Sequence, residues 1–318
     1  MAPTGFNGRA FVTDDDIDKT SRLLTDVFGV TRFTPEFLRW LYRESPQGRE
    51  IESNYDVGEK RLAHYAVIPD TYHRAEDLLP VALSLNTAVS HEVRRKGLFT
   101  KLGEETYHKA LSTRGIKAVV GVGNRRSTPG LVGKLRFTFL TALPVRMGLA
   151  LGLRKSTVRS YPVSPDFLHG ELFGAIAQRI DYAPKERWSA KWSARKLQWR
   201  LESPALRFQL HVHDTGVMIS TCDRRWRIPV AIILKFFAFT PGAEVHVPPL
   251  LSAACWSHGA PLWLYAGFNE CARVGGLAPP RRLLPAPLNL TYRPLCSTAP
   301  VPADFVLSTF EFLDFDAY

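Results

Sequence analysis

The stretch from Val81 to Phe99 carries the most informative change of hydrophobic pattern in the chain. Its first part, VALSLNTAV (81–89), is mostly apolar with β-branched residues, which predicts a strand. From Leu98 to Leu111 apolar residues recur at roughly helical spacing, and Gly115 supplies a stop signal. Between strand and helix lies the basic turn RRKG (94–97). First-turn N–H groups have no partner within a helix, and the helix dipole is positive there, so the turn predicts an anion site suited to a diphosphate.

The chain before this stretch predicts two helices and a strand. Residues 14–28 place apolar side chains at helical spacing and begin with acidic residues, which suit a helix N-terminus. Thr34 is a predicted N-cap, followed by a proline at the first position of a second helix that runs through Tyr42. Residues 61–68, RLAHYAVI, predict a strand that Pro69 closes.

The second half repeats some of these features. WRLESP (199–204) resembles WLYRESP (40–46) about half the chain away, as expected for a tandem repeat. Strand patterns follow in the second half at residues 208–212, 217–221 and 228–234. The equivalent of the basic turn, within 242–259, contains proline and is not basic, so this half lacks the predicted anion site. Residues 310–315 alternate apolar and acidic side chains and predict a last strand.

The composition of the chain narrows the classes of function that suit it. A chain of 318 residues suits two domains, and its net charge of +11 suggests a polyanionic partner such as nucleic acid, acidic lipid or a phosphorylated cofactor or substrate. The four cysteines form no CxxC pair, which argues against zinc or redox motifs, and no P-loop, GxSxG elbow or HExxH run is present. The first residues are polar and the apolar runs are short, so we expect a cytoplasmic protein without a membrane span.

The stretch 81–99 resembles motif A of the GNAT superfamily of N-acyltransferases. That family has an Arg/Gln-x-x-Gly-x-Gly/Ala turn after its fourth strand, where backbone amides bind the pyrophosphate of coenzyme A. Arg94 and Gly97 match it, whereas Phe99 replaces the final small residue and His91 replaces the usual proline. The resemblance implies acetyl-CoA or another acyl-CoA as co-substrate. The cofactor-binding residues that it implies are Thr87, Ala88, Val89, Arg94, Arg95, Lys96, Gly97, Leu98, Phe99, Asn124 and Ser127.

The segment after the motif A helix also resembles the family. Residues 117–122 predict a strand, and in GNAT proteins this strand splays from the motif A strand so that acyl-pantetheine lies in the gap. Asn124 and Ser127 match the polar residues that often contact the cofactor there. Val132 stands where many relatives have a tyrosine that protonates the departing thiolate, so no acid is assigned.

The resemblance implies an α/β fold with mixed sheets, in two tandem GNAT-like domains, each a mostly antiparallel sheet flanked by helices. Residues 1–160 are then an N-terminal GNAT domain that binds acyl-CoA. Residues 161–318 are a degenerate GNAT-like domain with an acceptor or structural role. The oligomeric state is not indicated by the sequence.

Two classes of function remain open. The first is an acyl-CoA-dependent N-acyltransferase, or acetyltransferase, whose acceptor is a primary amine of a small molecule, for which a nucleotide-linked amino sugar would suit the charge. The motif A strand offers no strong base, so deprotonation requires water, His64 in the preceding strand, or the second half. The second class is a FemX-like aminoacyl-tRNA-dependent transferase or a basic nucleic-acid-binding protein on the same fold; the RxxG turn favours the first class and makes nucleic acid a less expected partner.

One aromatic cluster bears on the nucleic-acid alternative. Trp188, Trp192 and Trp199 are interleaved with lysines and arginines, a combination that can stack on bases. Their spacing also places them along one side of a helix, and we favour such a packed helix.

Overall fold

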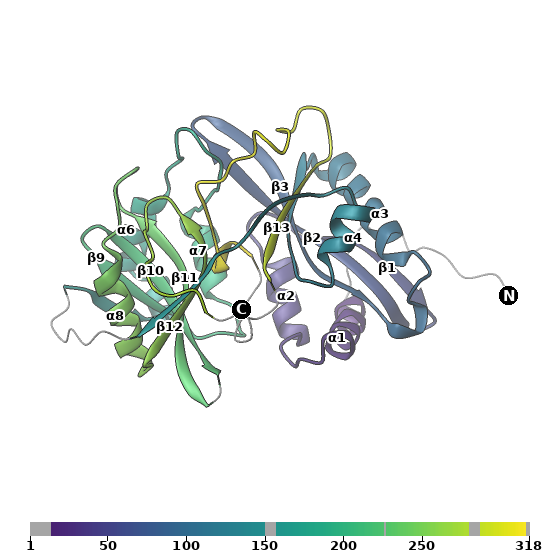
Figure 1. Cartoon of the computed structure of the whole chain (residues 1–318). Coiled ribbons are helices and arrows are strands. Elements are labelled where there is room, and N and C mark those ends of the chain that lie inside the picture. Colours follow the sequence, from purple (N-terminus) through teal and green to yellow (C-terminus); the bar gives the residue numbers. More distant parts are fainter. Residues whose placement is uncertain (1–13, 150–156, 226, 280–286, 316–318) are drawn as a thin grey trace. The chain divides into compact units, whose positions relative to one another are not determined.

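The structure is a computed structural model that describes residues 14–149, 157–225, 227–279 and 287–315 (Figure 1). Its contacts divide the described chain into two compact units. The first contains the residues up to Thr71, Leu79–Thr141 and Leu288–Asp304; the second contains Tyr72–Leu78, those between Ala142 and Pro287, and those from Phe305 on. The sequence predicts one boundary at residue 160, and the structure differs because each half contributes a strand to the sheet of the other unit.

The first unit is built on one mixed sheet. Its helices are α1 (Asp14–Phe28), α2 (Pro35–Arg43), α3 (Leu98–Arg114) and α4 (Thr128–Lys134), with a 3₁₀ turn η1 (His91–Val93). Its strands are β1 (Ile51–Val57), β2 (Lys60–Arg74), β3 (Asp77–Val89), β4 (Ala118–Gly123), β5 (Thr138–Ala142) and β13 (Asn289–Pro294), in the spatial order β1-β2-β3-β4-β13-β5. β3 and β4 are parallel, whereas β1–β2 and β4–β13 are antiparallel.

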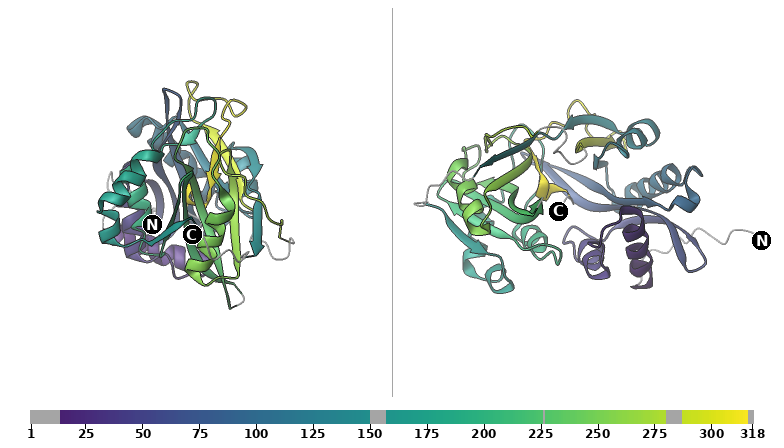
Figure 2. Two further views of the ribbon diagram at one scale, coloured as in Figure 1. Left: turned by 90° about the vertical axis from the view of Figure 1, so that its left-hand side faces the viewer. Right: turned by 60° about the horizontal axis from the view of Figure 1, so that its bottom comes forward.

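The helices of the first unit lie on opposite faces of its sheet (Figure 2). Side chains alternate along β2, so Tyr65 packs in the core with Leu102 and Tyr107 of α3, while its neighbour His64 faces Tyr42 of α2. Thr34 Oγ1 accepts a hydrogen bond from the N–H of Phe37 and caps α2, as its sequence predicts. The two faces of β2 therefore differ, with a tyrosine packed against α3 on one and a histidine bonded to α2 on the other.

The second unit is built on a sheet of the same kind. Its helices are α5 (Pro165–Leu168), α6 (Glu171–Ile180), α7 (Ala194–Leu201) and α8 (Val247–His258), with a 3₁₀ turn η3 (Phe312–Asp314). Its strands are β6 (Val145–Leu149), β7 (Arg159–Pro162), β8 (Ser189–Ala190), β9 (Gln209–His213), β10 (Gly216–Arg225), β11 (Ile228–Ala238), β12 (Leu262–Asn269) and β14 (Thr309–Glu311). The order is β14-β12-β11-β10-β9-β7, and β6 also pairs with β12. β8 is not part of this sheet; it pairs with Tyr72 and His73, the end of β2 that belongs to the second unit. Only the pair β11–β12 is parallel among those described for this unit.

The elements confirm the predicted mixed α/β fold and correct three local predictions. β2 continues through Pro69, because β1 pairs no further along it than Val67 and the missing N–H is not needed on that side. The last strand ends at Glu311, and the next residues form η3. The tryptophan helix is shorter than predicted: Ser193 caps α7, so Trp188 and Trp192 precede it, although both indoles are buried. None of the helices in the described ranges has the length and apolarity needed to cross a bilayer.

Candidate active site

The basic turn lies between β3 and α3, as predicted. Arg94, Arg95, Lys96 and Gly97 are all exposed. Arg95 has φ +67° and Gly97 has φ +73°, the left-handed conformation that favours glycine. A Cβ at Gly97 would meet no atom within 4 Å, so its Cα faces open space in front of the helix.

The N-terminus of α3 leaves its first donors available. Gly97 occupies the N-cap position without a side-chain cap, and the first turn contains no acidic residue. No described residue accepts a hydrogen bond from the N–H groups of Leu98, Phe99 or Thr100. These donors, the partial positive charge of a helix N-terminus and the three cations of the turn are the groups that protein anion sites use.

Strands β3 and β4 part just before this turn. Their parallel ladder runs from the pair Val81–Ala118 to the pair Ser84–Gly121 and ends there. β3 continues to Val89 and β4 to Gly123, so no residue of β3 after Ser84 pairs with β4 in the described chain. Asn86 has φ +51° just past this point, which marks a local irregularity in β3. The backbone of β3 is thereby left free on this side to bind a ligand.

The predicted cofactor residues after β4 lie in the turn that begins α4. Asn124 Oδ1 accepts hydrogen bonds from the N–H groups of Arg126 and Ser127 and closes the turn that begins α4. The ring of Phe99 packs against Gly130 in the first turns of α4, where an added Cβ would lie 3.0 Å from it. Phe99 also packs on Tyr65, with 5.8 Å between ring centroids. Phe99, where the family has a small residue, thus joins the start of α3 to α4 by packing.

Not every predicted cofactor residue can contact a ligand through its side chain. Leu98 and Ala88 are buried, at 8% and 2% exposure, and Leu98 belongs to the core under α3. Val89 packs against the same core, while Thr87 is half-buried. Leu98 and Ala88 can therefore contribute only through their backbone, whereas the turn 94–97 offers both backbone and charged side chains.

A cavity of about 720 Å³ opens beside the turn. It is lined by Arg94, by residues of α1 and by the β1–β2 hairpin. Lys19 and Lys60, which also line it, are paired with Asp15 and Glu59 and with Glu92. Arg22 and Arg94, by contrast, form no ion pair with any residue that the structure describes, so their positive charges are available to an anionic ligand.

Three hydroxyl groups meet on the α3 face where the strands part. Tyr65 Oη lies 3.1 Å from Ser84 Oγ and also bonds Tyr107 Oη. Burial raises the pKa of both tyrosines, so both are protonated at neutral pH. The sequence indicates no hydroxyl that could protonate a leaving thiolate, because Val132 stands at the position where relatives have a tyrosine; Val132 lies on α4 and is 40% exposed. The alternation of side chains along β2 could have indicated Tyr65, since it places Tyr65 on the opposite face from His64.

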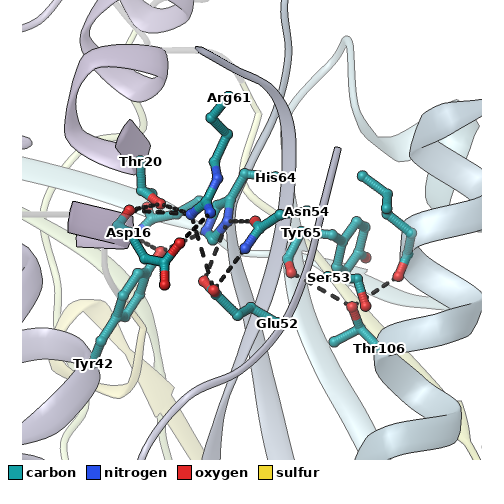
Figure 3. Close-up of polar contacts among 12 residues, drawn as sticks. Asp16, Thr20, Tyr42, Glu52, Ser53, Asn54, Arg61, His64, Tyr65 and Thr106 are labelled. Atoms are coloured by element: carbon teal, nitrogen blue, oxygen red, sulfur yellow. Dashed lines mark hydrogen bonds and ion pairs between the residues drawn. The ribbon is translucent and has the colours of Figure 1, made fainter. Parts of the chain in front are cut away.

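His64 is buried on the opposite face of the sheet (Figure 3). Its Nδ1 lies 2.7 Å from Asn54 Oδ1, and its Nε2 lies 3.0 Å from Tyr42 Oη. Burial, and then the nearby Arg61, hold its pKa well below the usual 6.5, so the imidazole is neutral. With 0% exposure it cannot touch an acceptor; the prediction that it relays a proton therefore requires Tyr42 as an intermediary.

Charged groups fix this buried network to the surrounding elements. Asn54 Nδ2 donates to Glu52 Oε1 at 2.6 Å. Arg61 donates to Asp16 and Thr20 of α1 and to Asp56 of β1, which ties the helix to the hairpin (Figure 3). Tyr42 was not predicted as a site residue, because its link to His64 joins positions 22 residues apart.

The second unit has a similar parting of strands, but it is occupied. The ladder between β11 and β12 ends at the pair Ile233–Tyr265, although β11 continues to Ala238 and β12 to Asn269. The carboxylate of Glu311 lies between them and accepts hydrogen bonds from Phe236 N, Tyr265 Oη and Asn269 Nδ2 at 3.0–3.3 Å. The gap is therefore closed by a side chain of the chain itself.

A buried ion cluster holds the Glu311 carboxylate in this gap. Lys235 Nζ lies 3.1 Å from Glu311 Oε2 and 2.7 Å from Asp314 Oδ2, and Trp192 Nε1 donates to the other oxygen of Asp314. Burial lowers the pKa of Lys235, but the two carboxylates outweigh it and leave the amine charged. A cavity of about 450 Å³ lies beside the cluster. The turn before α8 carries Gly242 at φ +73° but no lysine or arginine between Thr240 and Val245.

Comparisons with known proteins place this architecture. No protein-family pattern matches the sequence, and no curated protein resembles it in sequence. The fold is similar to a GCN5-related N-acetyltransferase from Anabaena variabilis, with a TM-score of 0.58, 15% identity, and coverage of 90% of this chain and 72% of that one. It is also similar to N-myristoyltransferase from Saccharomyces cerevisiae with bound myristoyl-CoA, with a TM-score of 0.56, 10% identity, and coverage of 92% and 84%. A GCN5-related N-acetyltransferase from Kribbella flavida is similar as well, with a TM-score of 0.53, 14% identity, and coverage of 89% of this chain and 69% of that one.

The chain thus has the fold of the GNAT acyltransferases, arranged as two tandem GNAT-like units. This confirms the resemblance that motif A indicates and the predicted class of fold. Within the residues that the structure describes, parted strands are followed by a basic, uncapped helix N-terminus only in the first unit.

Proposed function

We propose that the protein is an acyl-CoA-dependent N-acyltransferase whose cofactor site is in the first unit. The observation that carries the proposal is the end of the β3–β4 ladder at Ser84 and Gly121, on the strand that leads through η1 into the basic turn 94–97. The similar fold of N-acetyltransferases, and of an N-myristoyltransferase with bound myristoyl-CoA, supports the same class of co-substrate. Acetyl-CoA, or another acyl-CoA, is the proposed donor, and a primary amine of a small molecule is the proposed acceptor.

In this proposal the first residues of α3 bind the pyrophosphate. The N–H groups of Leu98, Phe99 and Thr100 donate to its oxygens, and Arg94, Arg95 and Lys96 add charge from the turn. Gly97 allows the backbone to approach the phosphates closely, because no side chain projects into the space in front of it. The free edge of β3 pairs with the pantetheine arm, and Asn124 and Ser127 lie beside it at the start of α4.

The transfer step needs a neutral amine and a stabilised leaving thiolate. The amine attacks the thioester carbonyl carbon, its nitrogen loses a proton, and the carbon–sulfur bond breaks to give amide and coenzyme A. The pKa of His64 lies too far below 6.5 for this residue to be the group that titrates near neutral pH. The deprotonation of the acceptor amine itself therefore determines how the rate rises with pH, and water is the immediate acceptor of its proton. Tyr65, whose pKa is raised by burial, is the proposed hydroxyl donor to the thiolate in place of the tyrosine that Val132 replaces.

A binding experiment tests the proposed class directly. The protein is applied to immobilised coenzyme A and eluted either with free coenzyme A or with an equal charge concentration of bulk tRNA. We expect elution by coenzyme A at concentrations near its dissociation constant and none by tRNA beyond the effect of added salt. Retention that tRNA alone reverses would instead favour an aminoacyl-tRNA-dependent transferase or a nucleic-acid-binding protein.

A further inference from the structure

Asn86 stands at the point where β3 leaves its partner strand. Its φ of +51° is a conformation that asparagine and aspartate tolerate better than other residues with a side chain. The side chain is half-buried, and its Nδ2 donates to Tyr42 Oη at 3.3 Å. Asn86 is therefore directed to the face of the sheet that α2 covers, opposite the face packed on α3.

The hydrogen bonds from Asn86 run in one direction. Asn54 Oδ1 can only accept, so His64 Nδ1 donates to it, and the neutral imidazole then accepts at Nε2 from Tyr42 Oη. Tyr42 Oη, whose proton is committed to His64, accepts from Asn86 Nδ2. At the far end Asn54 Nδ2 donates to Glu52. Every donor in this series of hydrogen bonds therefore points away from Asn86 and toward the carboxyl group of Glu52.

This order fixes the orientation of the Asn86 amide. Its Nδ2 is turned toward Tyr42, so Oδ1 is the group left for a ligand. None of the hydrogen bonds described for the chain uses Asn86 Oδ1 as an acceptor. An amide oxygen accepts from an amine N–H and thereby directs the nitrogen lone pair, without adding a charge that would favour the ammonium form.

We propose that Asn86 Oδ1 is the docking point for the acceptor amine, and that Tyr42 and His64 are positioning residues that hold the amide in that orientation. This inference rests on the proposed acyl-CoA-dependent function. It assigns the acceptor side of the reaction to the first unit and defines the acceptor as a primary amine small enough to reach the β3 irregularity. Tyr42, at 1% exposure, acts only through Asn86.

Two stable ligands test the docking point without knowledge of the natural acceptor. S-propyl-coenzyme A presents an apolar arm, and S-(2-aminoethyl)-coenzyme A presents an amine in the same place. Calorimetry should show that the wild-type protein prefers the aminoethyl form by about tenfold or more, as for a hydrogen bond with a charged donor. Asn86→Gly tolerates the positive φ and should lose this preference while binding the propyl form unchanged. Tyr42→Phe should reduce the preference by about threefold, because the amide is no longer oriented.

A matched control and a second variant keep the outcome decisive. Tyr292→Phe removes another largely buried tyrosine hydroxyl of the same unit, one that bonds Pro300 O, and should leave the preference unchanged. Aspartate also tolerates the positive φ at this position, so Asn86→Asp should fold and should raise the preference for the aminoethyl form further. This variant tests the docking point if Asn86→Gly does not fold. Preference retained in Asn86→Gly, or not raised in Asn86→Asp, overturns the docking point while leaving acyl-CoA binding intact. Failure of the wild-type protein to bind either ligand overturns the proposed function itself and this inference with it.

Discussion

The gap between β3 and β4 and the gap between β11 and β12 arise in the same way and end differently. In both, a parallel ladder stops while each strand continues for further residues. In the first unit the exposed turn that follows carries three cations; in the second, a carboxylate from β14 lies between the strands. The fold therefore forms the same kind of strand gap twice, and the two gaps differ in the side chains placed in or before them.

The ion cluster at the closed gap gives the largest expected effect. Lys235→Met leaves Glu311 and Asp314 as buried carboxyl groups without their cation, which should lower the free energy of unfolding by about 3–5 kcal/mol. Lys60→Met removes an exposed ion pair near the open gap and should cost about 0–1 kcal/mol. Urea unfolding of both variants measures the difference. A loss of unfolding free energy for Lys235→Met as small as that for Lys60→Met would show that the buried ion cluster around Glu311 does not stabilise the fold.

The two glycines before α3 and α8 allow a matched substitution. Gly97 and Gly242 both have φ +73°, and a Cβ at either would meet no atom within 4 Å. A glutamate at either position therefore carries a similar backbone strain, of about 1 kcal/mol. Gly97→Glu should also weaken coenzyme A binding by more than about 100-fold, because its carboxylate stands in front of the pyrophosphate donors.

The contrast between the two glutamate variants is the informative result. Calorimetric titration with coenzyme A should show near-normal affinity for Gly242→Glu and loss of binding for Gly97→Glu, with circular dichroism confirming that both are folded. Equal losses in the two would indicate a general effect of strain rather than an anion site at α3.

Buried histidines add a pH dependence that both units share. Burial, and then His258, lower the pKa of His211 to about 3, and its ring nitrogens bond Ser160 and Ser220 at 2.7 and 2.8 Å. The unfolded histidine has a pKa near 6.5, so unfolding takes up a proton below that value and stability is lost as pH falls. Each such histidine should contribute a slope of about 1.4 kcal/mol per pH unit between pH 6.5 and its folded pKa.

Replacement of one histidine isolates its share of this slope. His211→Gln keeps an amide able to bond the two serines and should reduce the slope of unfolding free energy against pH, measured between pH 6 and 4.5, by one proton. The slope due to His64 in the first unit, whose pKa is also well below 6.5, should remain. An unchanged slope would mean that His211 does not stay neutral in the folded protein.

The sequence predicted what depends on neighbouring residues. The limits of α1 and α3 and the cap of α2 followed from local periodicity, Gly115 and Thr34. The basic turn was also recognised, because its residues are consecutive. The mixed fold and its likeness to GNAT proteins were correct for the same reason, since motif A is a single continuous segment.

The features that sequence reasoning missed are those that join distant residues. β13 pairs with β4 across more than 160 positions, and no local pattern indicates that partner. Glu311 enters the second gap from a strand 75 residues after Phe236. The network around His64 likewise combines α2, β1, β2 and β3, and the sequence of one strand does not indicate these partners. The spacing of the tryptophans misled because irregular backbone can bury them as well as a helix can.

Stoichiometry tests the contrast between the two gaps most directly. Isothermal titration of the full chain with coenzyme A should give one site per chain, and Gly97→Glu should remove it completely. A second, independent site that survives Gly97→Glu would contradict the account, because it would place a ligand in the gap that Glu311 fills. The absence of any binding by the wild-type chain would contradict it as well, since the first gap would then hold no cofactor.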